Sequence, residues 1–78
     1  MTNHRELKKQ VEYEKTGWIT VRGGAPDFAF VKIENRKIVD VHFSEIKSPT
    51  DKLTQEQVMW KKILQEHLKA SYSVDIVD

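Results

Sequence analysis

Charged side chains stand in apolar rows near the ends of two neighbouring predicted strands. Alternate residues of a strand share a face, so Glu45 and Lys47 continue the apolar row that begins at Val39. Asp27 heads the apolar row of the preceding strand in the same way. Removing such charges from water is costly unless each finds a partner. A metal ion is the partner that would suit the two carboxylates.

The turn between these strands predicts that the two acidic residues are near-neighbours. Residues 34–37, Glu-Asn-Arg-Lys, favour a hairpin turn because of the Asn and the charges. Positions whose numbers sum to about 71 or 72 then face each other, and Asp27 and Glu45 sum to 72. Two carboxylates placed there would repel each other unless a cation lay between them.

The remaining sequence predicts the elements that position this hairpin. The first helix has a narrow apolar stripe at Leu7 and Val11, and the second opens with a capping box at Thr54 and Gln57. The last strand follows a helical crossover and should lie parallel to a neighbour, which gives an α/β fold with a mixed sheet flanked by two helices. The apolar stripe of the second helix is Trp60, Ile63, Leu64 and Leu68. The predicted elements are a helix over 5–15, strands over 18–21, 27–33 and 38–46, a helix over 54–69 and a strand over 72–77.

Length and composition restrict the class of protein. Seventy-eight residues form a single domain over 1–78, whose core is small enough that association would help it. There are no cysteines and no apolar run long enough for a bilayer, so we expect a cytoplasmic protein with no membrane partner. A net charge of +1 neither demands nor excludes nucleic acid.

Three motifs in this order resemble those of a nuclease family. They are Gly24-Ala25-Pro26-Asp27, Glu45-Ile46-Lys47, and Leu53-Thr54-Gln55-Glu56-Gln57 followed by Trp60. Together with the αβββαβ element order, they resemble the PD-(D/E)XK nuclease core and, more narrowly, the VRR-NUC family. The resemblance covers nearly the whole chain and implies a minimal restriction-endonuclease-like fold.

The resemblance also implies roles for the motif residues. It makes Asp27 and Glu45 ligands of Mg²⁺ or Mn²⁺, with the backbone carbonyl of Ile46 as a third protein ligand, and Lys47 the residue that orients and activates the attacking water. Such ions prefer hard oxygen ligands and keep several waters. Without the resemblance, the Pro-Asp turn could be solvent-exposed, and the Glu and Lys could be a weak pair on a solvated sheet edge.

Four further residues complete the predicted site. Gln57 matches a family glutamine beside the active site, although the capping box alone would explain a glutamine there. Glu6 is the candidate metal ligand from the first helix, which also carries Glu12 and Glu14. Arg22 and Lys52 flank the proposed active-site turns and could contact phosphates.

The resemblance implies a metal-dependent DNA endonuclease. It favours cleavage of branched DNA such as four-way (Holliday) junctions, and no recognisable helix-turn-helix or zinc module suggests sequence-specific restriction. Small stand-alone nucleases of this kind are typical of phages, which would place the protein in the host cytoplasm. The alternatives are a nickase or flap nuclease of replication and repair, and a non-catalytic nucleic-acid-binding module on the same fold.

A homodimer is the expected working unit. A four-way junction has approximate two-fold symmetry and needs two cuts, whereas one short chain offers one site. Phe28 and Phe30 point away from Asp27, and Ile38 and Ile46 point away from Glu45 in a regular strand. These four residues must be covered by the helices or by a second subunit.

Overall fold

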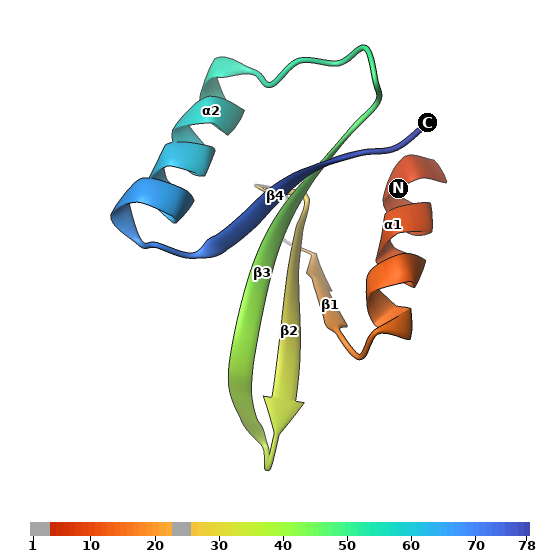
Figure 1. The fold of residues 1–78 in the computed structure, drawn as a ribbon, viewed down its shortest axis with the longest axis vertical. Coiled ribbons are helices and arrows are strands. Elements are labelled where there is room, and N and C mark those ends of the chain that lie inside the picture. Colours follow the sequence, from red (N-terminus) through yellow and green to blue (C-terminus); the bar gives the residue numbers. More distant parts are fainter. Residues whose placement is uncertain (1–3, 23–25) are drawn as a thin grey trace.

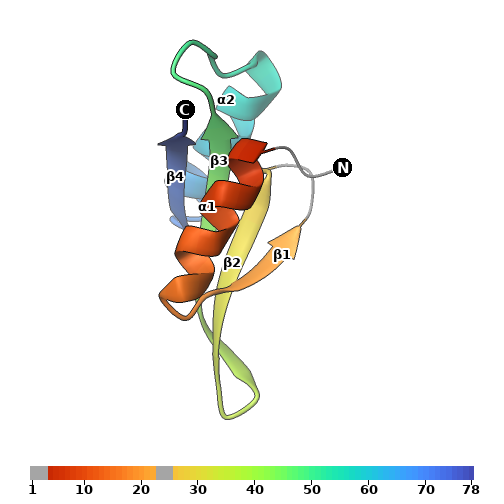
Figure 2. The ribbon, with the colours of Figure 1, turned by 90° about the vertical axis from the view of Figure 1, so that its right-hand side faces the viewer.

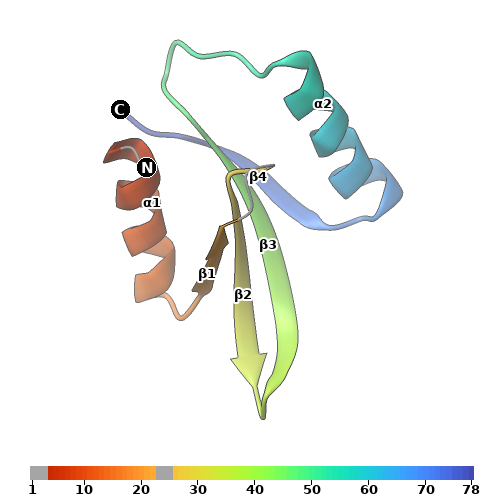
Figure 3. The ribbon, with the colours of Figure 1, turned by 180° about the vertical axis from the view of Figure 1, so that it is seen from behind.

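A single four-stranded sheet separates two helical layers. The computed structural model describes residues 4–22 and 26–78. The sheet order is β1-β2-β3-β4, with antiparallel β1–β2 and β2–β3 pairs and the predicted parallel pair between β3 and β4. Figure 1 shows α1 and α2 on opposite sides of this sheet, and Figure 3 shows the same division from behind. The elements are α1 (His4–Lys15), β1 (Ile19–Arg22), β2 (Phe28–Glu34), β3 (Lys37–Lys47), α2 (Gln55–Lys62), the π-helical turn η1 (Ile63–His67) and β4 (Ser71–Ile76).

The β2–β3 hairpin has the register that its turn residues predict. Asn35 and Arg36 have φ values of 51° and 64°, the left-handed conformation that a tight two-residue turn requires at both central positions. From Phe28 opposite Ser44 to Lys32 opposite Asp40, paired residue numbers sum to 72. The predicted register, with paired numbers that sum to 72, is therefore confirmed for these residues.

A register shift near the turn corrects one predicted orientation. Ile33 pairs with Ile38 rather than with residue 39, which leaves Val39 as an extra residue, as in a β-bulge. Residues directly opposite each other share a face, so Ile38 lies on the face of Ile33 and Val31. That is the face of Glu45, and the expectation that Ile38 points away from Glu45 is wrong.

Helix α1 covers one face of the sheet. The Tyr13 ring stacks on Phe30 with centroids 4.1 Å apart, over a core cluster of Phe28, Phe30, Ile46 and Val77. Figure 2 shows α1 lying across β2 and β3. The predicted stripe of α1 does not form the contact: Leu7 is 52% exposed, because the helix is attached through Tyr13 and through the Arg5 Nε–H that donates to the Val77 carbonyl, at 2.9 Å.

A polar network crosses the same face and ties β4 to α1 and β3. Asp75 Oδ2 accepts hydrogen bonds from the hydroxyls of Tyr13 at 2.9 Å, Ser73 at 3.0 Å and Ser44. Ser44 is fully buried, so its hydroxyl depends on this carboxylate for a partner. One carboxylate therefore satisfies donors from three elements.

Helix α2 covers part of the other face. Its predicted capping box is present, since Thr54 Oγ1 accepts from the Gln57 N–H and the Gln57 side chain accepts from the Thr54 N–H. Of the predicted stripe, Leu64 is buried, whereas Leu68 is 61% exposed. The helix ends in the π-helical turn η1, whose extra residue per turn breaks the 3.6-residue spacing on which the stripe depends.

The coarse fold prediction has an outcome here. The structure is an α/β fold with a four-stranded mixed sheet and two helices, as expected. No helix within the described ranges is long and apolar enough to cross a membrane.

Replacing Asp75 with alanine should destabilise the fold by about 2–4 kcal/mol, because several buried or half-buried hydroxyls lose a charged acceptor. Urea unfolding followed by circular dichroism measures the change. Asp40→Ala is the matched control, since Asp40 is exposed and its carboxylate bonds only to the neighbouring Val41 N–H in the described contacts. Equal stability of the two variants would contradict this role for Asp75.

Candidate active site

The two predicted acidic residues meet at one end of the β2–β3 hairpin. Asp27 directly precedes β2, and continuation of the strand register places it opposite Glu45. Asp27 Oδ2 accepts the Ile46 N–H at 2.9 Å, which fixes its carboxylate against β3. Glu45 is only 4% exposed and lies on an inner strand, so it is not on a solvated sheet edge. Asp27 is half-buried rather than fully exposed in its turn.

The Glu45 carboxyl has an unusual acidity. Burial is the largest cause that raises its pKa from 4.5 to about 7, followed by the negative charge of Asp27 and a hydrogen bond between the two carboxyl groups. The positive charge of Lys47 offsets part of this rise. Glu45 therefore keeps its proton to a higher pH than an ordinary glutamate, and a cation bound between the carboxyl groups would favour its ionised form.

Gln57 caps α2 and also contacts Glu45. Its Oε1 accepts the Thr54 N–H at 2.9 Å and so caps α2, while its Nε2 donates to Glu45 Oε1 at 2.7 Å. Because the cap engages the amide oxygen, the amide nitrogen is left for the acid. The start of α2 is thereby attached to the buried carboxyl group.

The Ile46 carbonyl points to the β2 side of β3. In an extended strand the N–H and C=O of one residue point to the same side, and the Ile46 N–H points to Asp27. The neighbouring Lys47 carbonyl points the other way, where it accepts the Val77 N–H at 2.8 Å. Pro26 would oppose Ile46 if the register continued, and proline has no N–H to offer. The carbonyl is thus placed to serve as a third oxygen ligand.

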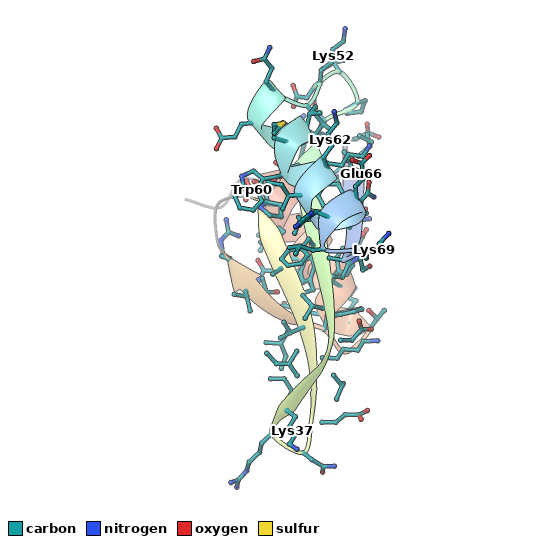
Figure 4. The ribbon with its side chains drawn as sticks, turned by 90° about the vertical axis from the view of Figure 1, so that its left-hand side faces the viewer. Lys37, Lys52, Trp60, Lys62, Glu66 and Lys69 are labelled. Atoms are coloured by element: carbon teal, nitrogen blue, oxygen red, sulfur yellow. The ribbon has the colours of Figure 1, made fainter. Side chains whose placement is uncertain are left out.

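Of the remaining predicted residues, Lys47 shares the face of Glu45, whereas Arg22 and Glu6 lie on the α1 side of the sheet. Lys47 is half-buried and follows Glu45 by two positions, so it shares its face. Arg22 donates to Glu6 Oε1 at 2.9 Å, and its guanidinium lies 4.8 Å from the centroid of the Phe28 ring. Lys52 is exposed and projects from the loop before α2 (Figure 4). The assignment of Glu6 to the metal, and of Arg22 and Lys52 to phosphates, stays a prediction.

A tyrosine that the sequence prediction missed also faces the pair. Tyr72 pairs with Phe43 across β3–β4 and so shares the face of Glu45. Its hydroxyl is buried and has no hydrogen-bond partner in the described part of the chain. Burial raises its pKa, and the negative charges of Glu45 and Asp27 raise it further. The alternation of side chains along the last strand groups Tyr72 with Val74, but the sequence does not show on which face of the sheet this group lies.

These groups fit a small divalent cation. Among residues 4–22 and 26–78 no cluster of three or more His, Cys, Asp or Glu side chains could hold a metal, so the site offers two carboxylates. Mg²⁺ commonly binds through one or two carboxylates and keeps several waters, which need hydrogen-bond partners of their own. The unpaired Tyr72 hydroxyl supplies such a partner beside the acids. The buried, mutually repelling carboxylates supply the charge.

Comparisons with family models, characterised proteins and solved structures gave no match to this chain. The resemblance therefore rests on the motif residues alone, and the geometry around Asp27 and Glu45 is independent support for a site there.

The metal-free protein should become less stable as the pH rises from about 4.5 to about 7. The unfolded chain releases the Glu45 proton near pH 4.5, whereas the folded state retains it up to about pH 7, so stability is lost across this window. Urea unfolding at pH 5 and pH 8 measures the change, with Glu45→Gln as the control that cannot titrate. If the wild-type and Glu45→Gln proteins lost the same stability between the two pH values, Glu45 would not be the cause.

Tyr72→Phe should leave stability unchanged or raise it by up to about 1 kcal/mol, because it removes a buried hydroxyl that has no partner. The same change should weaken Mn²⁺ binding by roughly 10-fold, since a partner of the bound water is lost. Titration calorimetry measures the affinity. Tyr13→Phe is the matched control: its hydroxyl bonds to Asp75 on the other face, so it should lower stability and leave Mn²⁺ affinity unchanged.

Proposed function

We propose that this chain is a Mg²⁺- or Mn²⁺-dependent endodeoxyribonuclease of the VRR-NUC type that hydrolyses phosphodiester bonds in branched DNA. The observation that carries the proposal is the burial of Glu45 against Asp27, which raises the Glu45 pKa to about 7. Enzyme sites are where such perturbed carboxyl groups concentrate. A binding module on the same fold would have no need of a buried carboxylate pair that repels itself.

Each residue of the site has a role in the proposed reaction. Asp27, Glu45 and the Ile46 carbonyl would hold the ion, and Gln57 keeps the Glu45 carboxyl in place through the 2.7 Å hydrogen bond. When bound, Mg²⁺ or Mn²⁺ lowers the pKa of a coordinated water and offsets charge on the scissile phosphate. The Lys47 ammonium lies on the same face, where it would orient the attacking water and stabilise the negative charge that develops on the phosphate.

Branched DNA is the proposed substrate because of the motif resemblance. Arg22 and Lys52, at the end of β1 and in the loop before α2, offer positive charge for the DNA backbone. A panel of a four-way junction, a flap, a nicked duplex and a linear duplex distinguishes the proposed substrate from those of a nickase or flap nuclease.

Alanine substitution of Asp27, Glu45 or Lys47 should lower the cleavage rate by about 10³-fold or more while the fold survives, because each removes a metal ligand or the charge beside the water. Ca²⁺ should support DNA binding without turnover. Cleavage of end-labelled DNA with Mg²⁺ or Mn²⁺ measures the rate, and circular dichroism checks folding.

Glu34→Ala and Lys37→Ala are the matched controls, since both residues are exposed beside the hairpin turn at the other end of β3. They should cleave at the wild-type rate. Near-wild-type cleavage by Glu45→Ala would disprove the site assignment. Tight DNA binding by the wild-type protein, with no cleavage of any substrate under either metal, would support the binding module instead.

A further inference from the structure

The face of the sheet that carries Glu45 is only partly covered. Helix α2 lies over one end of this face, and the far end around Lys37 extends beyond the helix (Figure 4). The side chains on the uncovered part are apolar and 48–62% exposed. We name them the hairpin patch: Ile19, Val21, Ile33, Ile38 and the bulge residue Val39.

Beside the hairpin patch, the charged strand residues Arg22 and Lys32 lie on the opposite face. Arg22 lies over the Phe28 ring, and the Lys32 ammonium lies 4.4 Å from the Trp18 ring centroid. A sheet face turned to water normally shows the reverse pattern, with polar side chains outward. All five residues of the hairpin patch are aliphatic, so the patch has no positive charge to bind DNA phosphates. The partner that fits it is another apolar surface.

The amount of exposed surface points to a second copy of this chain. The chain exposes 5646 Å², whereas a compact monomer of 9.2 kDa is expected to expose about 4,900 Å². The excess of roughly 700 Å² is close to the ~800 Å² that each partner buries in a standard interface. The radius of gyration of 12.6 Å likewise exceeds the ~11.5 Å expected for this length.

The interior is correspondingly small. The buried apolar residues in the described ranges are Phe28, Phe30, Val31, Ile46, Leu64 and Val77. They are divided between the two faces of the sheet, so neither helix layer encloses a large core. Chains of this size commonly gain the missing stability by association.

We infer that the hairpin patch is the interface of a two-fold homodimer, in which the same sheet face of two copies packs together. A two-fold interface must be self-complementary, and a row of β-branched side chains can interdigitate with its own copy. Phe28, Phe30 and Ile46, expected to be covered by the helices or by a second subunit, are covered within the chain by Tyr13 of α1 and by Trp18. The interface does not depend on the nuclease proposal.

Light scattering on the purified protein should give a mass about twice 9.2 kDa at concentrations on the order of tens of micromolar. Ile38→Lys should raise the dimer dissociation constant by about 100-fold or more, because it places a charge in an apolar interface. Leu7→Lys is the matched control: Leu7 is 52% exposed, against 62% for Ile38, but lies on α1 away from the patch. It should leave the mass unchanged.

The melting temperature of the wild-type protein tests the inference even if Ile38→Lys fails to fold. Dissociation coupled to unfolding makes the melting temperature rise with protein concentration. A mass of one chain together with a concentration-independent melting temperature would overturn the inference and leave the patch to some other partner. Equal dissociation by Leu7→Lys and Ile38→Lys would also overturn it. Cleavage assays on the same samples test the nuclease separately.

Discussion

The structure depends on the close approach of Asp27 and Glu45, which favours the protonated form of Glu45. The hairpin holds their carboxyl groups together, and burial of Glu45 prevents water from screening them. Three contacts keep the arrangement in place: the Ile46 N–H binds Asp27, the Gln57 amide binds Glu45, and the capping box fixes Gln57. These contacts fix the positions of both carboxyl groups at the end of the hairpin.

The strand register is the geometric condition for that pair. The left-handed Asn35 and Arg36 set a two-residue turn, and the turn determines which residues face each other as far as Ser44. A slip of one residue would move Glu45 to the α1 face, among Phe28 and Phe30. The bulge at Val39 lies close to the turn, so it changes the orientation of Ile38 while the register near Glu45 stays intact.

The sequence predicted those structural features that depend on a single local rule. The turn chemistry at residues 34–37 predicted the register, and the capping box at Thr54 predicted the start of α2. Prediction from the sequence failed where the answer depends on packing between distant segments. Leu7 is exposed because Tyr13 and Arg5 decide how α1 lies on the sheet, and the face of Tyr72 depends on how β4 pairs with β3. The restriction-endonuclease-like fold stays a prediction.

The Gln57 amide connects the N-terminus of α2 to the Glu45 carboxyl group, so fraying of this helix end changes the environment of that acid. When the first turn of α2 opens, the hydrogen bonds of Gln57 to the Thr54 N–H and to Glu45 break at the same time, because one side chain makes both bonds. The carboxyl group then loses its amide donor at the moment when its cover loosens and water enters. Hydrogen exchange at the start of α2 and proton exchange at Glu45 therefore report one local opening.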